Sequence, residues 1–339
     1  MSERFDFSAT LGQLLNRRDL TAEETRTFFE QLLSGEIGDA EAAAILVALR
    51  MKGESAGELA AGAQCLREKM LRFDTGRNDV LDTCGTGGDG AGSFNISTAA
   101  ALVAAGAGVP VVKHGNRAVS SRTGSADVLA ELGVNLDGAA SELRSFLDRT
   151  NFTFCFAPHF HPALKQIGPL RKRLGIRTIF NLLGPLANPA GAAYQLLGVG
   201  RIELLDPMAG ALAQLGLRHG YVVCADDGFD EISLSTKTHF RCVRSGNVSQ
   251  GVWTAADFGL EPCRLDELQA VDAKQSASII EGVLGGLSGP AQRIVAANSA
   301  VALLAAERTT DLRDAVSMAM QSILSGRAKS VLEGLRSKR

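Results

Sequence analysis

Glycines, hydroxyl-bearing residues and one lysine are concentrated between residues 81 and 125 of this chain of 339 residues. The glycines let the backbone turn sharply and approach a ligand without a Cβ in the way. Ser97 and Thr98 then begin an alanine-rich stretch, and the unpaired N–H groups at the start of a helix favour an anion. A second apolar run, 109–112, brings Lys113 to the same edge of a sheet. We therefore expect a ligand that carries phosphate.

A dinucleotide site is the first alternative, because Gly85, Gly87 and Gly90 have G-x-G-x-x-G spacing. That pattern needs a helix that begins inside the glycine run and an acidic residue after the next strand. Here the helix begins later, near Ser97, and the next strand ends in Lys113, which suits a phosphate or diphosphate better than a ribose diol. A dinucleotide-dependent oxidoreductase is therefore disfavoured. A glycine-rich turn without a chemical role would not need the neighbouring hydroxyls and lysine.

A second cluster, residues 158–189, combines prolines, glycines and histidines with four basic residues between 171 and 177. A run of charges is commonly a solvated face, but arginine also offers a rigid fork for a carboxylate. The prolines and glycines around these charges fix the shape of the backbone. His159 and His161 have a spacing that could indicate a metal, yet no third ligand is evident nearby, so we expect local hydrogen bonding.

A third cluster, residues 226–231, is rich in carboxylates and directly follows the apolar run 221–225. Carboxylates at the carboxyl end of a strand are a reasonable site for Mg²⁺, which binds a few carboxylate oxygens together with phosphate and water. An exposed acidic turn is the alternative.

Composition limits the classes of partner. With 35 basic and 37 acidic residues and a formal net charge of −2, the chain shows no electrostatic footprint for nucleic acid or membrane. Its six cysteines have no C-x-x-C spacing and indicate buried thiols in a reducing compartment. The first residues are polar, and the most apolar stretch, 96–112, is interrupted by Gly106, Gly108 and Pro110. We expect a cytoplasmic protein with neither a nucleic-acid nor a membrane partner.

The pattern of elements divides the chain. Residues 8–71 indicate helices only, with capping boxes at Thr21 with Glu24 and at Ser55 with Glu58. From Val80 onward strands and helices alternate, which predicts an α/β fold: a small all-helical domain plus a larger α/β domain with a central parallel or mixed sheet flanked by helices. The expected strands are 80–83, 109–112, 152–156, 194–199 and 220–225, and the expected helices 97–106, 123–132, 139–149 and 204–216. The span 160–190 interrupts the alternation, and 292–335 is helical again.

Together the three clusters resemble the anthranilate phosphoribosyltransferase family, which has the nucleoside phosphorylase/phosphoribosyltransferase fold. The resemblance covers roughly residues 8–335, and its motifs occur in family order: 85–89, 95–98, 113–121, 124–127, 161–189 and 230–231. It implies a homodimer whose subunits have a helical domain joined by a hinge to an α/β domain. The helical domain would be residues 1–75, with part of 160–190 packing onto it. The phosphoribosyl-diphosphate-binding domain would be 76–159 and 191–339.

The implied reaction transfers the 5-phosphoribosyl group of 5-phosphoribosyl 1-diphosphate (PRPP) to the amine of anthranilate, an early step of tryptophan biosynthesis. Asn116 and Arg171 would face anthranilate, and Ser97, Asp230 and Glu231 would hold two Mg²⁺ ions. Because an arylamine is already neutral at pH 7, we expect no obligatory catalytic base, and Lys113 and Arg171 would act electrostatically. The residues implied to bind substrate are Gly85, Gly88, Asp89, Ser93, Asn95, Ile96, Ser97, Thr98, Lys113, His114, Gly115, Asn116, Arg117, Ala118, Val119, Ser120, Ser121, Ser125, His161 and Arg171.

Two related alternatives remain at the level of sequence. A pyrimidine nucleoside phosphorylase has a similar Lys-His loop, but it would use phosphate as nucleophile without Mg²⁺. Gly115-Asn116 and the cluster 171–189 favour the anthranilate enzyme. A relative that has lost catalysis and binds nucleic acid would have eroded glycine and metal motifs and a basic surface, and the sequence has neither.

Overall fold

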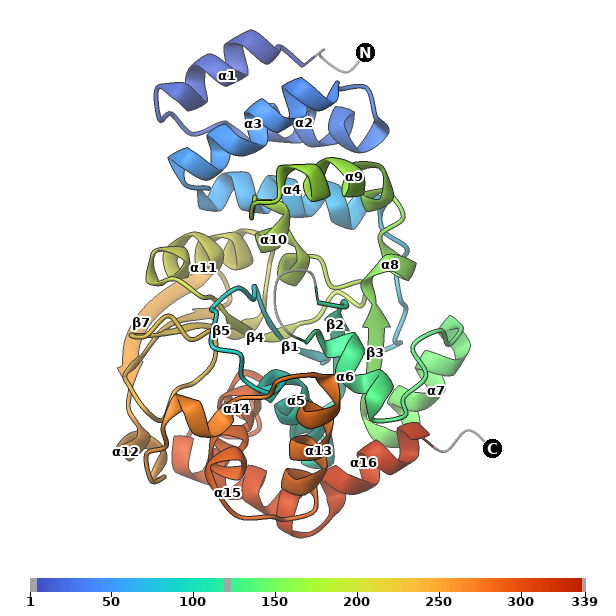
Figure 1. Cartoon of the computed structure of the whole chain (residues 1–339), viewed down its shortest axis with the longest axis vertical. Helices are drawn as coiled ribbons and strands as arrows, with labels where there is room; N and C mark the ends of the chain where they lie inside the picture. Colours follow the sequence, from blue (N-terminus) through green and yellow to red (C-terminus); the bar gives the residue numbers. More distant parts are fainter. Residues whose placement is uncertain (1–4, 119–122, 337–339) are drawn as a thin grey trace.

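The computed structural model of the chain describes residues 5–118 and 123–336. Figure 1 shows a helical part at one end and a larger part, in which helices surround a sheet, at the other. The fold is the expected one, an N-terminal helical domain with a larger α/β domain. None of the helices in the described ranges is long and apolar enough to cross a membrane.

The first helices pack through apolar stripes. They are α1 (Phe7–Leu15), α2 (Ala22–Ser34), α3 (Asp39–Lys52) and α4 (Ala56–Lys69). On α2, Phe28, Phe29, Leu32 and Leu33 recur at helical spacing and are all buried. The edge-to-face contact of Phe29 with Phe180, with ring centroids 5.5 Å apart, ties this core to a distant segment of the chain.

That distant segment is the span that interrupts the alternation of strands and helices. It contains α8 (Ala157–Phe160), α9 (Leu164–Leu174), α10 (Phe180–Leu183) and η1 (Gly184–Leu186). Helix α9 contacts α2 and α3 and contributes Ile167 and Leu170 to their core. In Figure 1 the green α9 accordingly lies among the blue N-terminal helices.

Strands in the described ranges form one seven-stranded sheet in the order β3-β2-β1-β4-β5-β6-β7. They are β1 (Leu81–Gly85), β2 (Val111–Gly115), β3 (Phe152–Phe156), β4 (Tyr194–Gly198), β5 (His219–Ala225), β6 (Thr238–Arg244) and β7 (Asn247–Trp253). The five strands expected from the sequence are present and parallel. The antiparallel hairpin of β6 and β7 was not expected, because its second strand is mostly exposed and polar and lacks an apolar run.

Both faces of the sheet are covered, and successive strand residues belong to different cores. On one face of the sheet, Leu196 and Val223 pack in the core that contains α5 (Ile96–Gly106) and α14 (Pro290–Ala305). On the other face, Leu197 and Val222 pack in the core shared with the helical domain. The other flanking elements are α6 (Ser125–Glu131), α7 (Ala140–Thr150), η2 (Ile202–Leu204), α11 (Leu205–Gln214), α12 (Ala255–Phe258), η3 (Leu265–Leu268), α13 (Ala273–Leu284), α15 (Leu312–Leu324) and α16 (Arg327–Arg336).

Strand β1 is the point at which the chain changes direction across the sheet. It pairs with β2 on one side and with β4 on the other. In open α/β sheets such a switch point opens a crevice outside the carboxyl ends of the strands. The loops that follow β1, β2 and β5 carry the motifs found in the sequence, and they meet at this edge.

Candidate functional site

A cleft of about 640 Å³ lies at the carboxyl edge of the sheet. Its walls come from the glycine loop after β1, the start of α5, the loop after β2, the start of α6 and the loop after β5. The residues implied from the sequence that line it are Gly85, Gly88, Asp89, Ser93, Asn95, Ile96, Ser97, Lys113, His114, Gly115, Asn116, Arg117, Ala118, Ser125, Asp230 and Glu231. Thr98, His161 and Arg171 do not line it, and Val119, Ser120 and Ser121 lie outside the described residues.

The glycine loop bends through backbone conformations that favour glycine. Gly87 has a φ of 65° and Gly88 a φ of 81°, in the left-handed region where a Cβ is strained. The N–H of Thr86 donates to the carbonyl of Gly198 at 2.9 Å. The N–H of Gly87 donates to Oδ2 of Asp230, also at 2.9 Å. These bonds fasten the loop after β1 to β4 and to the loop after β5.

The N-terminus of α5 faces a carboxylate of the chain itself. The N–H of Ser97 donates to Oε1 of Glu231 at 3.1 Å, as the positive end of a helix favours. Asn95, just before the helix, is held by Ser276 of α13, whose hydroxyl accepts from the Asn95 N–H and donates to its Oδ1. The anion-binding end of α5 is thus fixed by residues far apart in sequence.

Lys113 lies beneath the cleft and is only 2% exposed. Its Nζ donates to the carbonyl of Thr83 and, at 3.2 Å, to Oγ of Ser97. Burial lowers the pKa of Lys113, and the neighbouring Asp82 opposes that shift. Asp82 accepts from the His114 N–H, and burial raises the pKa of Asp82 to about 6. Lys113 and Asp82 are therefore both shielded from water, where the lower dielectric constant strengthens the interaction between their charges.

The carboxylates at the cleft repel one another. Burial, followed by the charge of Asp89, raises the pKa of Asp230 to about 7. Burial and the charge of Asp230 raise the pKa of Glu231 well above its ordinary value. Within the described ranges, His, Cys, Asp and Glu form no group of three that would hold a metal by itself. Two carboxylates with the hydroxyl of Ser97 instead fit Mg²⁺, which takes one or two carboxylates and completes its shell with phosphate and water.

The carboxylates of the third cluster, residues 226–231, lie in two different environments. Asp230 and Glu231 are at the cleft, whereas Asp226 and Asp227 are exposed. Oδ1 of Asp226 lies 2.6 Å from Nε2 of His239. The alternative of an exposed acidic turn thus describes the first half of the cluster only.

Of the second cluster, residues 158–189, only Arg177 and Asn181 line the cleft. The guanidinium of Arg171, on α9, lies over the ring of Phe180 at 5.5 Å, and burial lowers the pKa of Arg171. His161 is buried with its ring 5.0 Å from that of His114. Burial lowers the pKa of His114 to about 3, so that this imidazole is neutral near pH 7. His161 does not join a metal site in the described residues.

Some lining residues were not assigned to substrate or metal from the sequence, although several stand in its motifs. They are Cys84, Thr86, Gly87, Gly90, Gly92, Phe94, Thr123, Gly124, Arg177 and Asn181. Arg177 belongs to the second cluster, residues 158–189, but no feature of the sequence around it indicates which basic residue of that cluster reaches the glycine loop. Its Nη2 donates to the carbonyl of Thr86 at 2.6 Å, across 91 positions of sequence.

Comparison with known proteins identifies the class. The model described as "Glycosyl transferase family, helical bundle domain" matches residues 8–70, and the "Glycosyl transferase family, a/b domain" model matches residues 77–329. A sheet with this cleft, carrying a helical bundle, thus defines a glycosyl transferase.

Named relatives narrow the class. An anthranilate phosphoribosyltransferase of Symbiobacterium thermophilum is 45% identical over 328 residues, which are 97% of this chain and 96% of that protein. The crystal structure of the Thermus thermophilus enzyme has a TM-score of 0.89 and 40% identity, and the match covers 97% of this chain and 99% of that one. The Saccharomyces cerevisiae enzyme in complex with PRPP and Mg has a TM-score of 0.85 and 28% identity, over 97% of this chain and 96% of that one. The yeast enzyme has also been solved with 4-fluoroanthranilate.

The chain belongs to the anthranilate phosphoribosyltransferase family, which confirms the resemblance found in its motifs. It is accordingly an enzyme, a pentosyltransferase.

Proposed function

We propose that this enzyme transfers the 5-phosphoribosyl group of PRPP to the amine of anthranilate, giving N-(5-phosphoribosyl)anthranilate and diphosphate in tryptophan biosynthesis. The observation that carries the proposal is the cleft at the switch point, where glycine-loop backbone, the start of α5, Lys113 and two carboxylates converge. The names of relatives at about 45% identity support the same reaction.

The donor would occupy the part of the cleft between the glycine loop and α5. Gly85, Gly88 and Asp89 would contact it from the loop after β1, and Ser93 and residues 95–97 from the approach to α5. Lys113, Asn116 and Ser125 would complete the pocket, together with Ser121, which lies outside the described residues. Lys113 would supply a positive charge beneath the diphosphate. Preorganised donors and charges of this kind stabilise a leaving group in a dry site without reorganisation.

Asp230, Glu231 and Ser97 would hold Mg²⁺, and the family resemblance implies two ions. When bound, Mg²⁺ would neutralise diphosphate charge and orient the donor. Such an ion would offset the burial and the mutual repulsion that raise the pKa values of Asp230 and Glu231.

Anthranilate would bind on the side of α9 and of Asn116, which follows β2. Arg171 would pair with its carboxylate, Asn116 would face the same substrate, and His114 would supply a neutral wall with His161 behind it. An arylamine is already uncharged near pH 7, so the reaction needs no obligatory general base. Catalysis would come from positioning and electrostatics as positive charge develops at the ribosyl carbon.

At the level of the molecule we propose a cytoplasmic homodimer. The helical domain would be residues 1–75 together with part of 160–190, and residues 76–159 and 191–339 would form the donor-binding domain. Closure of one domain on the other would exclude water and so limit hydrolysis of the donor.

The direct test follows the fluorescence of anthranilate with purified protein, PRPP and Mg²⁺. Consumption that requires all three components is the expected result. Pyrimidine nucleosides with inorganic phosphate, in the absence of Mg²⁺, test the rival phosphorylase. Phosphorolysis of nucleosides, or no consumption of anthranilate by a folded dimer, would overturn the proposal.

A further inference from the structure

Arg177 connects the helical side of the molecule to the glycine loop. It follows α9 after Gly175, which ends that helix with a φ of 63°. Its side chain lies at the wall shared by the large cleft and a smaller cavity of about 110 Å³ between the two domains. No role for Arg177 follows from the motifs or from the cleft alone.

Two observations show that Arg177 bears on the shape of the loop. Its Nη2 donates to the carbonyl of Thr86 at 2.6 Å. Its guanidinium also lies so close to Gly88 that a Cβ at that position would overlap it. The adjacent N–H of Gly87 donates to Asp230 at 2.9 Å. The bend at residues 86–88 is therefore held between Arg177 on one side and Asp230 on the other.

The guanidinium of Arg177 also lies close enough to Asp230 and Asp89 for their charges to act on it. Burial lowers the pKa of Arg177, Asp230 and Asp89 oppose that shift, and Arg50 and Arg201 reinforce it. A charge-assisted hydrogen bond to a carbonyl is stronger than a neutral one. Arg177 is thus suited to fix the conformation of the glycine loop, because the glycines have no side chains that could form hydrogen bonds of their own.

We propose that Arg177 is a positioning residue for the phosphoribosyl diphosphate donor. By holding the carbonyl of Thr86, it keeps residues 86–88 in the bend that presents the loop backbone to the diphosphate. Loss of Arg177 should therefore weaken binding of the donor, PRPP, and leave binding of the acceptor, anthranilate, unchanged. This inference rests on the proposed function.

The test measures equilibrium binding of PRPP with Mg²⁺ by calorimetry, without anthranilate, for the variants Arg177→Ala and Arg177→Lys. Loss of a charged hydrogen bond predicts a Kd for PRPP about 10- to 100-fold higher in Arg177→Ala. Lysine keeps the charge and one donor, so Arg177→Lys should recover most of the affinity. The KM for anthranilate in Arg177→Ala should stay within about twofold of wild type, in contrast to the large effect on PRPP.

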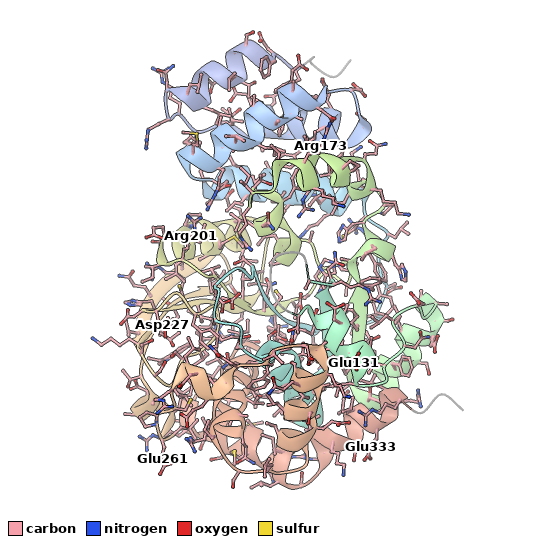
Figure 2. The ribbon with its side chains drawn as sticks, in the orientation of Figure 1. Glu131, Arg173, Arg201, Asp227, Glu261 and Glu333 are labelled. Carbon is pink, nitrogen blue, oxygen red and sulfur yellow. The ribbon has the colours of Figure 1, made fainter. Side chains whose placement is uncertain are left out.

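Matched controls are Arg173→Ala and Arg201→Ala, both labelled in Figure 2. Arg173 pairs with Asp39 on the outside of α9. Arg201 lines the small cavity only. Neither variant should change the Kd for PRPP.

The outcomes separate the two proposals. If wild-type protein fails to bind PRPP, the proposed function fails. If wild type binds and Arg177→Ala binds equally well, the positioning role is wrong. An equal loss for both substrates, with a lowered melting temperature that Arg177→Lys does not restore, would show a purely structural role and would also overturn it.

Discussion

At the scale of residues, the carboxylates near the cleft differ in how they are paired. Asp82 is fully buried close to the buried Lys113, whereas Asp230 and Glu231 are half-buried in the lining of the cleft. Charges removed from water are tolerated only when paired, hydrogen-bonded or bound to a metal. Asp82 has such partners in the His114 N–H and in Asn188. Asp230 and Glu231 accept one backbone N–H each, from the glycine loop and from the start of α5, and so are the carboxylates with capacity left for a cation.

Replacing either of these carboxylates should therefore impair turnover through the metal. Asp230→Ala or Glu231→Ala is expected to lower kcat by roughly 10²-fold, as for removal of a transition-state stabiliser, and to weaken the dependence on Mg²⁺. Rates over a Mg²⁺ titration provide the measurement. Asp226→Ala, in the same loop but exposed and paired with His239, is the control that should behave as wild type. Wild-type rates at limiting Mg²⁺ in the site variants would refute the metal role.

Arg171 should act on the acceptor. Its guanidinium lies over Phe180, and Asn181, the residue after Phe180, lines the cleft. Arg171→Ala is expected to raise the KM for anthranilate about 10- to 100-fold, the cost of a lost charge-assisted bond, with little change for PRPP. Steady-state kinetics with each substrate varied in turn would measure this. Equal effects on both substrates would remove Arg171 from the acceptor site.

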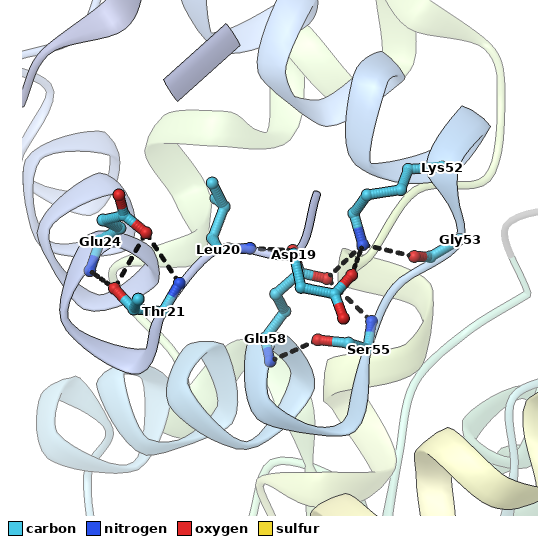
Figure 3. A network of polar contacts seen from close by, with 8 residues as sticks. All are labelled: Asp19, Leu20, Thr21, Glu24, Lys52, Gly53, Ser55 and Glu58. Carbon is cyan, nitrogen blue, oxygen red and sulfur yellow. Dashed lines mark hydrogen bonds and ion pairs between the residues drawn. The ribbon is translucent and has the colours of Figure 1, made fainter. Parts of the chain in front are cut away.

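At the scale of elements, the two capping boxes expected from the sequence are both present but lie in different surroundings. Glu58 is fully buried and accepts from the N–H groups of Leu20 and Ser55. Its Oε2 also receives Nζ of Lys52 at 2.9 Å, and that Nζ reaches Asp19 at 2.6 Å (Figure 3). The Ser55–Glu58 box therefore joins several helices through a buried ion pair.

The other box is nearer to solvent. Thr21 and Glu24 exchange their hydrogen bonds at the exposed start of α2. Glu24 has one further contact, from the side-chain amide of Gln13 on α1. This box therefore acts mainly on its own helix.

The two boxes should differ in their effect on stability. Glu58→Ala breaks a buried ion pair with Lys52 and leaves the N–H groups of Leu20 and Ser55 without their acceptor, which costs about 3–5 kcal/mol of unfolding free energy. Glu24→Ala removes half of an exposed cap and costs about 1 kcal/mol. Chemical denaturation of both variants would measure the difference. Similar losses would show that Glu58 acts as an ordinary cap.

The parallel strands and the motif-bearing loops could be predicted because their signals are local. Apolar runs marked β1 to β5, and residues directly after parallel strands must meet at one edge of the sheet. The hairpin β6–β7 could not, since its second strand is largely exposed and has no apolar run. Arg177 and Asn181 could not be placed because their positions at the cleft depend on how α9 and α10 pack. Arg171 and Thr98 stand in the motifs but not in the lining of the cleft, since Arg171 lies over Phe180 and Thr98 is buried on α5.

At the scale of the whole molecule, the helical domain meets the α/β domain at the small cavity. Glu54, between α3 and α4, is 4% exposed there, and neither oxygen of its carboxylate has a hydrogen-bond partner in another residue. Arg50, Arg177 and Arg201 line the same cavity. Burial raises the pKa of Glu54; its own backbone N–H, Arg50 and Arg201 oppose the shift, and Glu58 adds to it. An ionised carboxylate here costs stability that nearby arginines offset only in part.

Glu54→Gln should therefore stabilise the protein in a manner that depends on pH. Because the pKa of Glu54 is higher in the folded than in the unfolded chain, folding disfavours its ionisation, and stability is lost as pH rises from the ordinary carboxyl range through the raised pKa. The variant cannot ionise, so its melting temperature should match wild type near pH 4 and exceed it by a few degrees near pH 7. Glu131→Gln, an exposed carboxylate labelled in Figure 2, should show no such trend. Thermal unfolding at a series of pH values decides the matter. A variant less stable than wild type at pH 7 would mean that Glu54 pairs with an arginine across the two domains in solution, and that the cavity is a latch between them.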